Sequence, residues 1–188
     1  MKLQAVKDDA TDQNFRQIAQ SLRSTPMVSA LPSTSVVGTD IYFKVAAGTI
    51  WHLLYTGEET LPWTKIGGAA LLDKTAVEKS TASTSYVTLE NSPTITTPAV
   101  KIEANVRIGA RLIVTGGPSF AYATMFTSGG AEVAATASEW NSGSPHGGTV
   151  FEAVALTASM TYTLRYKTSA GTSFWNHRYI EIDPTRVG

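Results

Sequence analysis

The sequence predicts a mainly β protein with a short N-terminal α-helix, a small β-module and a C-terminal antiparallel β-sandwich of the jelly-roll type. Three observations indicate this fold class. Runs with alternating apolar and polar residues recur through the second half of the chain, separated by glycine- and serine-rich turns. Only 16% of the 188 residues are charged, well below the usual share. A helical pattern occurs once, near the N-terminus, so a βαβ architecture is excluded.

The helical pattern covers residues 8–24. Acidic residues at its start can cap the first turn, and Pro26 prevents its continuation. Phe15, Ile18 and Leu22 follow the 3-then-4 spacing of a coiled-coil seam. A lone amphipathic helix packed on its own domain has the same pattern. Because so short an isolated helix is marginal in water, we expect partner chains to order it, and we assign residues 1–30 to an attachment segment and helical stalk.

Residues 31–72 are expected to form the small β-module. Apolar alternation and turn residues predict three strands in it, near Thr39–Val45, Thr49–Thr56 and Trp63–Ile66. Three aromatic residues form its predicted core, Tyr42, Trp51 and Trp63. Three strands with one apolar face are about the minimum for independent stability, so the module would gain from packing against copies of itself.

Residues 73–188 are expected to form the sandwich head. The alternation predicts strands near Ser85–Leu89, Val100–Val106, Arg111–Val114, Ser119–Phe126, Thr149–Leu156, Thr161–Lys167 and Phe174–Ile182. Pro184 is expected to break the last of them. Short strands with regular turn signals are typical of a sandwich or jelly roll.

The polar segment Gly129–Gly148 is the candidate ligand-binding loop. It contains Trp140, Asn141 and His146 among serine and glycine residues. An aromatic side chain in a polar loop at the end of a domain is a common way to build a binding surface. The alternative is that Trp140 caps the edge of the core or packs against a neighbouring subunit.

Few patterns suggest catalysis or a bound cofactor. His52, His146 and His177 are far apart in the sequence, and the chain has no cysteine, so no metal-ligand spacing occurs. Glu139 beside Trp140 could serve a sugar site. The other acids of the head mostly alternate with apolar residues, as solvent-facing or interface charges do: Glu103, Glu152, Glu181 and Asp183. There is no nucleophile elbow, P-loop, dinucleotide fingerprint or calcium loop. We therefore expect a protein that is not an enzyme and uses no cofactor.

Charge and hydropathy limit the expected partners. Fifteen acidic and fifteen basic residues give zero formal net charge, without the basic stripe that nucleic-acid binding needs. No apolar run approaches the roughly 18–20 residues that cross a bilayer. The N-terminal residues carry acids early and lack the apolar core of a signal peptide. We expect neither nucleic-acid binding nor membrane insertion.

The order of aromatic residues and glycines in residues 31–72 resembles a small β-module of virion structural proteins from tailed bacteriophages. The resemblance is carried by Pro32, Gly38, Ile41, Tyr42, Phe43, Gly48, Trp51, Leu53, Tyr55, Trp63, Ile66 and Gly67. In such proteins the module joins an N-terminal attachment segment to a C-terminal β-rich head. It commonly has a longer insertion before its second tryptophan, where this chain has only the short segment Gly57–Leu61.

The resemblance implies a non-enzymatic virion structural protein, assembled in the host cytoplasm, such as a fibre or decoration subunit. It implies a homotrimer whose stalk seam is Phe15, Ile18 and Leu22, and whose N-terminal segment docks on other virion proteins. A receptor- or carbohydrate-binding tail-tip protein is the first alternative, with the loop around Trp140 facing a host-surface glycan. A glycan depolymerase is the second, but the sequence offers no paired carboxylates or catalytic triad.

Overall fold

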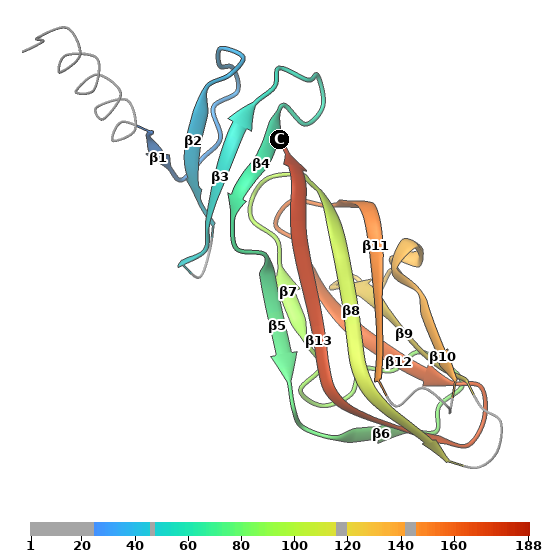
Figure 1. Ribbon diagram of the computed structural model, residues 1–188. Helices are drawn as coiled ribbons and strands as arrows, with labels where there is room; N and C mark the ends of the chain where they lie inside the picture. Colours follow the sequence, from blue (N-terminus) through green and yellow to red (C-terminus); the bar gives the residue numbers. More distant parts are fainter. Residues whose placement is uncertain (1–24, 46–47, 116–119, 142–145) are drawn as a thin grey trace, which may run out of the picture.

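The structure, a computed structural model, describes residues 25–45, 48–115, 120–141 and 146–188. It is mainly β, as predicted, and its strands form two sheets that pack on each other in the head (Figure 1). The predicted helix over residues 8–24, with its seam of Phe15, Ile18 and Leu22, lies outside the described residues. The stalk therefore stays a prediction.

The smaller sheet contains four strands in the order β10-β9-β12-β7. Their bounds are β7 (Thr94–Thr96), β9 (Phe120–Thr127), β10 (Ser138–Asn141) and β12 (Thr161–Thr168). Strand β12 shows why this segment is a strand: every second residue is buried, and the residues between them are only partly buried. Alternation with a period of two places one row of side chains in the core and the other on the outer face.

Strand β13 (Thr172–Val187) is an inner strand of the larger sheet and pairs with other strands on both of its sides. On one side it pairs along its length with β8 (Ile102–Thr115), which in turn pairs with β11 (His146–Leu156). On its other side it pairs in succession with three shorter strands, β6 (Lys79–Thr81), β5 (Leu71–Thr75) and β4 (Trp63–Gly68). One long strand therefore connects the β-module to the head.

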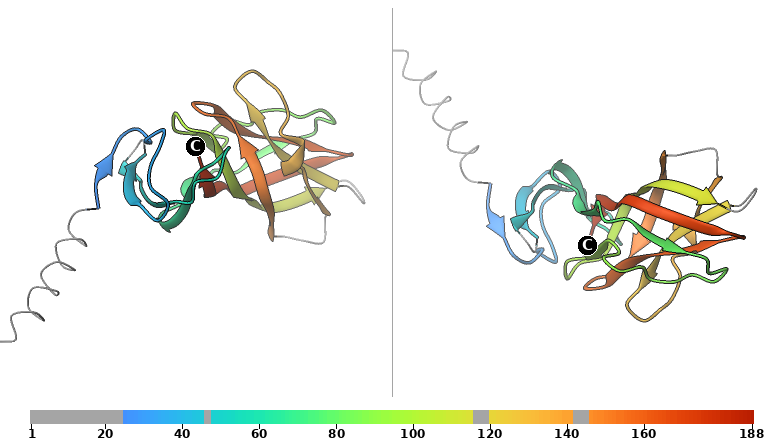
Figure 2. Two further views of the ribbon diagram at one scale, coloured as in Figure 1. Left: turned by 90° about the horizontal axis from the view of Figure 1, so that it is seen from above. Right: turned by 90° about the horizontal axis from the view of Figure 1, so that it is seen from below.

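The β-module extends the larger sheet beyond β4 with β3 (Ile50–Tyr55), β2 (Asp40–Lys44) and the two-residue β1 (Met27–Val28). Figure 2 shows the module as a curled layer at one end of the head. Its three predicted strands agree with β2, β3 and β4 to within two residues at each end. Gly68 has a φ of 96°, and a Cβ there would lie 2.2 Å from the carbonyl oxygen of Ile50, so this position requires glycine.

Aromatic side chains fill the space between the two sheets of the head. Trp175 of β13 is fully buried, and its ring lies 4.7 Å from that of Tyr166 on β12. Trp140 of β10 meets Trp175 edge-on, with ring centroids 5.6 Å apart. The same cluster of buried apolar residues continues into the β-module, where Trp51 and Trp63 are fully buried. Head and module thus share one hydrophobic core.

Three details of the predicted strands are wrong. Pro184 does not break the final strand, because β13 continues to Val187; instead, the pairing with β8 shifts register between Pro184 and Arg186. A proline lacks the N–H that a regular ladder needs, and a bulge accommodates that loss. Residues 85–89 form no named strand, and Val87 makes a single bridge to Tyr166. The two strands predicted between Val100 and Val114 are one continuous strand, β8.

Candidate functional site

The β-module buries two of its three predicted core aromatics. Trp51 and Trp63 are fully buried, and the indole N–H of Trp51 donates a hydrogen bond to the carbonyl oxygen of Ala69 at 3.0 Å. Tyr42 instead lies on the outward face and is 37% exposed. Its ring stacks on His52, with centroids 4.7 Å apart. Strand alternation gives the inward positions of β2 to the neighbours of Tyr42 on either side, Ile41 and Phe43.

The outward face of the module carries a small polar cluster. His52 Nε2 lies 2.8 Å from Asp40 Oδ2, and the hydroxyl of Thr25 donates to the same oxygen at 3.2 Å. The hydrogen bond from His52 is the main reason why the pKa of Asp40 is lowered from its usual value. This cluster connects the start of the described chain to β2 and β3.

The predicted binding loop contains a short 3-10 helix (Ala134–Thr136), strand β10 and the start of β11. Trp140 lies in β10 and is only 8% exposed, because its ring packs on Trp175. This matches the alternative in which Trp140 closes the core, and it removes the exposed aromatic side chain from the predicted site. Asn141 ends β10, and His146 begins β11 opposite Arg111, although the His146 side chain lies outside the described residues. Trp140 is therefore not part of an exposed loop surface, and the binding role of Asn141 and His146 stays a prediction.

The outer face of the smaller sheet is covered by aromatic rings and cations that contact one another. Lys167 Nζ lies 4.3 Å from the ring of Tyr86 and 5.0 Å from that of Tyr122. Burial is the main cause that raises the pKa of Tyr122, and a hydrogen bond with Glu139 adds to it. Burial likewise raises the pKa of Tyr86 to about 12. Glu139 thus contacts a tyrosine on this face and not a second carboxylate across a cleft.

The outer face of the larger sheet carries a groove of about 1040 Å³, which we call the sheet groove. The strand registers place four residues in one row across it, Lys74, Tyr179, Gly109 and Gly148, on β5, β13, β8 and β11 respectively. A Cβ on Gly109 would lie 2.2 Å from Cε1 of Tyr179, so the tyrosine ring occupies the space above this glycine. A Cβ on Gly148 would lie 3.1 Å from the Tyr179 hydroxyl. Tyr179 and the two glycines form the floor of the groove, and Lys74 lies at its rim.

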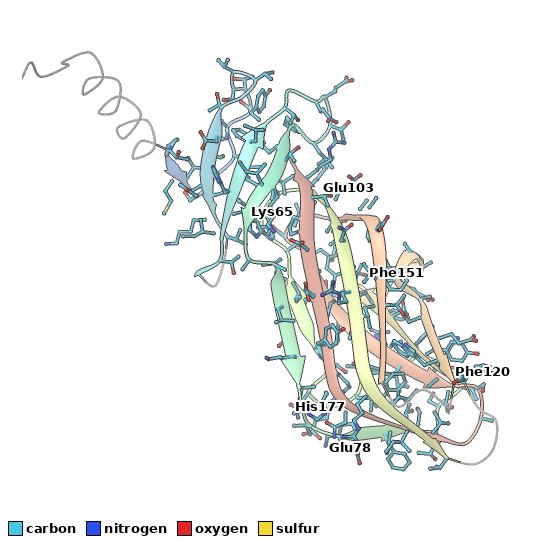
Figure 3. All side chains as sticks on the ribbon, viewed as in Figure 1. Lys65, Glu78, Glu103, Phe120, Phe151 and His177 are labelled. Carbon is cyan, nitrogen blue, oxygen red and sulfur yellow. The ribbon has the colours of Figure 1, made fainter. Side chains whose placement is uncertain are left out.

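Apolar and basic side chains line the rest of the groove. Leu72 on β5 is 53% exposed, and Arg111 on β8 and His177 on β13 lie at the end beyond Tyr179. Figure 3 shows His177 in the half of the head away from the β-module, near Glu78. Within the described part of the chain, no carboxylate forms an ion pair with Lys74, Arg111 or His177.

A bulge in β13 determines which side chains reach the groove. Its register with β8 shifts between Asn176 and Tyr179, so Asn176 and His177 both face outward before the alternation resumes. His177 has a φ of 47°, in the left-handed region that favours glycine, and its N–H donates to Oδ1 of Asn176 at 2.7 Å. Bulges with such backbone strain are common next to functional sites, where they redirect side chains.

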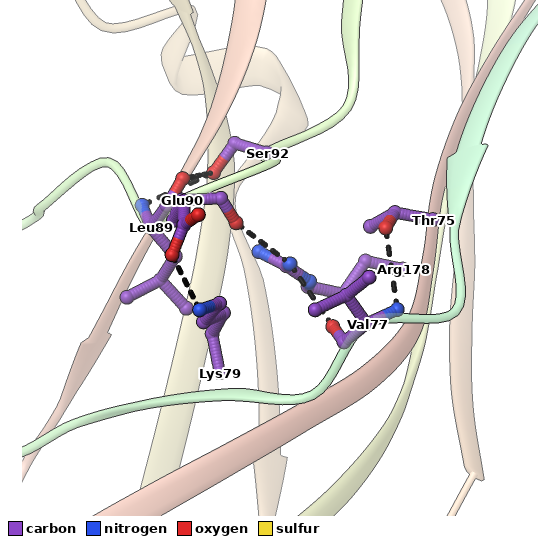
Figure 4. Close-up of polar contacts among 7 residues, drawn as sticks. All are labelled: Thr75, Val77, Lys79, Leu89, Glu90, Ser92 and Arg178. Carbon is purple, nitrogen blue, oxygen red and sulfur yellow. Dashed lines mark hydrogen bonds and ion pairs between the residues drawn. The ribbon is translucent and has the colours of Figure 1, made fainter.

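The same bulge turns Arg178 into the core, where it is fully buried (Figure 4). Its Nη2 donates to the carbonyl oxygens of Val77 and Glu90, at 3.1 Å and 3.0 Å. The guanidinium also lies over the ring of Tyr166, 5.5 Å from its centroid. The carboxylate of Glu90 points elsewhere and pairs with Lys79. Arg178 therefore ties two connecting segments of the head to β13.

No motif in the sequence predicts this groove. Its lining combines residues more than 100 positions apart, such as Leu72 and Tyr179, and Lys74 and Arg111 have no motif spacing. A single glycine inside an apolar strand pattern, such as Gly109, is the one local signal, since it often marks a close approach of another group. Among the described residues there is no cluster of three potential metal ligands. The described residues also include no helix long and apolar enough to cross a membrane.

No protein-family model matches the chain, and a search of curated proteins finds no match. Among solved structures, the chain is similar to a GH26-CBM35 β-(1,4)-mannanase of Podospora anserina, with 16% identity and a TM-score of 0.35, over 62% of this chain and 28% of that one. It is also similar to the T13 viral particle of infectious bursal disease virus, with 12% identity and a TM-score of 0.36, over 82% and 46%.

A third similarity is to a family two carbohydrate esterase of Cellvibrio japonicus, with 10% identity and a TM-score of 0.25, over 64% of this chain and 35% of that one. The chain thus spans less than half the length of each of these proteins. Similarities this low assign neither a family nor a function to the chain.

Proposed function

We propose that the chain is a non-enzymatic structural protein of a tailed-bacteriophage virion, a fibre or decoration subunit that attaches through its N-terminal segment and exposes its β-rich head. The observation that carries the proposal is the way the β-module is built into the head. Strand β13 pairs with β4 at Arg186 and Val187, and farther back with β5 and β6. The module that resembles phage virion proteins is therefore continuous with the exposed head.

Side chains reinforce this junction. Lys65 of the module, whose side chain is only 10% exposed, forms an ion pair with Asp183 of β13, with Nζ and Oδ1 2.5 Å apart. Arg186 forms a second ion pair with Glu58. The backbone ladder, the shared core and the ion pairs together resist bending between the β-module and the head. A subunit that holds its head at a defined angle on a particle needs such a junction, and this supports the structural role.

The homotrimer belongs to the same proposal. The mass of the full chain in solution, measured by light scattering, should be three times 20.0 kDa. Replacing the seam with serine at Phe15, Ile18 and Leu22 should lower it, whereas the matched control with serine at Gln13, Gln17 and Gln20 should not. A wild-type chain that is monomeric would contradict self-association through the N-terminal segment.

Location on the particle needs a separate test. An antibody raised against the head should label purified phage particles in electron micrographs, at sites repeated with the symmetry of one structure of the virion. Particles that carry no label, although the antibody detects the protein in the infected cells, would contradict the virion role whatever the oligomeric state.

A receptor- or carbohydrate-binding role is the second candidate. Because Trp140 is buried, it does not support this role; the sheet groove does, with Lys74 and Arg111, which form no ion pair with any described residue.

A further inference from the structure

We propose that the sheet groove binds a saccharide that contains uronic acids, with Tyr179 as the platform for a sugar ring and Arg111 and Lys74 as the contacts for its carboxylates. The inference goes beyond the structural role proposed above. It places glycan binding on a face of the head that the sequence did not indicate, and Trp140 has no part in it.

Two opposed glycines determine how Tyr179 lies on the sheet. Gly109 and Gly148 are directly opposed on β8 and β11, and both face outward in the row that contains Tyr179. Neither has a positive φ, so their backbone conformation does not require glycine. Glycine is required at both positions because Tyr179 occupies the space where a Cβ would lie. The two glycines therefore let the Tyr179 ring lie close against the sheet, where ordinary strand side chains would hold it away.

Tyr179 offers the surface for a sugar ring. The end of its ring covers Gly109, and the residue is half-buried, so the sheet lies against one side and the groove against the other. The face of an aromatic ring is electronegative, and the C–H groups on one face of a pyranose are apolar and weakly electropositive. Leu72 and Ala110 extend the apolar lining, as is usual in pockets that bind small molecules or sugars.

Two cationic side chains, Lys74 and Arg111, lie at the rim beside His177. Lys74, Arg111 and His177 have no ion-pair partner among the described residues, whereas Arg107 on the same face pairs with Glu181 at 3.3 Å. Glu78 lines a smaller adjoining cavity with Arg111, and the two form no ion pair. Charge-assisted hydrogen bonds to carboxylates are strong, and arginine can form them in bidentate geometry. An anionic ligand is therefore complementary to the groove, and a neutral glycan is not.

A second copy of the chain is the other occupant that this face could receive. Such a contact would have to place a carboxylate against Lys74 and Arg111, because buried unpaired charges are strongly unfavourable. The charge of these two residues and the half-buried ring of Tyr179 together favour a ligand from solution that carries carboxylates and sugar rings.

Isothermal titration calorimetry of the full chain tests the proposal. The probes are galacturonate and mannuronate oligosaccharides, the methyl ester of the galacturonate oligosaccharide as an uncharged control, and inorganic phosphate as an anion without a sugar ring. At least one uronate should bind, its ester at least about tenfold more weakly, and phosphate not at all. Arg111→Gln should weaken binding by about tenfold or more, as expected for one charge-assisted hydrogen bond. The matched variant Arg165→Gln, on the outer face of the smaller sheet, should leave binding unchanged.

Two variants test the platform. Tyr179→Ala should abolish binding. This substitution also uncovers Gly109, so Gly148→Ala, which places a methyl group on the floor of the groove, is a second and independent test. Thermal melting checks that each variant still folds. Equal binding of acid and ester, unchanged binding in Arg111→Gln, or no binding of either uronate would overturn the proposal. So would groove variants that lower the mass of an assembly without any saccharide bound, since the face would then be a subunit contact. Failure here would leave the particle-labelling result unaffected, so the two proposals fail separately.

Discussion

Replacing Arg178 with methionine should destabilise the head by about 2 kcal/mol. The guanidinium makes two charge-assisted hydrogen bonds to backbone carbonyls, at 3.1 Å and 3.0 Å, and such bonds contribute about 1.5–3 kcal/mol each. Against this gain stands the desolvation of a fully buried cation, which costs several kcal/mol without a carboxylate partner. The two bonds together contribute about 3–6 kcal/mol, and desolvation offsets much of this because Nε and Nη1 have no hydrogen-bond partner among the described residues, which leaves about 2 kcal/mol. Methionine keeps the apolar volume of the side chain, so the loss comes from the bonds to the carbonyls of Val77 and Glu90.

Urea denaturation followed by tryptophan fluorescence measures the change in the free energy of unfolding. Amide hydrogen exchange adds a local readout, because residues 76–78 and 89–92 should exchange faster in the variant while the centre of β8 does not. Arg178→Ala is the comparison, and it should cost more because it also leaves a cavity beside Tyr166. A methionine variant as stable as the wild type, with unchanged exchange in both segments, would refute the reasoning, since the hydrogen bonds would then contribute nothing beyond desolvation.

Three further predictions follow from single contacts. Gly109→Ala should cost about 1–3 kcal/mol in urea denaturation, because its Cβ would lie 2.2 Å from Tyr179; an unchanged midpoint would mean that the ring moves aside freely. His52 lowers the pKa of Asp40 in the folded protein. The Asp40 carboxylate therefore stabilises the fold at pH values above its ordinary pKa of about 3.9, and this stabilisation is lost as the pH falls through the lower pKa of the folded state. Asp40→Asn should therefore be less stable than the wild type at pH 7 and lose less stability on acidification, and parallel pH profiles would contradict this. Ultraviolet titration should show Tyr86 ionising at about pH 12, and this transition should be absent in Tyr86→Phe. The free energy of unfolding should fall from about pH 10 upward, because the tyrosine of the unfolded chain ionises there. Ionisation of Tyr86 at about pH 10 in the folded protein would contradict its burial.

Local patterns predicted the β-module well and the orientation of its strands less well. The alternation around Trp51 and the turn at Gly48 are sufficient to place β2 and β3, because both signals act within a few residues. Ile41, Tyr42 and Phe43 are consecutive and all apolar, so their sequence does not say which face is buried. A shift of one residue exchanges the two faces, and only packing against the neighbouring strands decides between them.

The candidate site was harder to predict because it depends on contacts between distant segments. Trp140 stands in a polar stretch, yet its burial follows from Trp175, which lies 35 positions later and on the other sheet. The sheet groove requires the registers of β5, β13, β8 and β11 together. Composition and periodicity carry no information on how a strand aligns with a partner more than 60 residues away. Lys74 and Arg111 are therefore brought together only by folding.

The position of β13 in the larger sheet has a consequence for biosynthesis. This strand lies between β8 on one side and β4, β5 and β6 on the other, yet it follows all of them in the sequence. During translation, the strands on both of its sides leave the ribosome before it does. Their free edges are open to pairing with other nascent chains until residues 172–187 arrive. Chains cut short before residue 172 should therefore aggregate, because β8 and the three shorter strands keep unpaired edges.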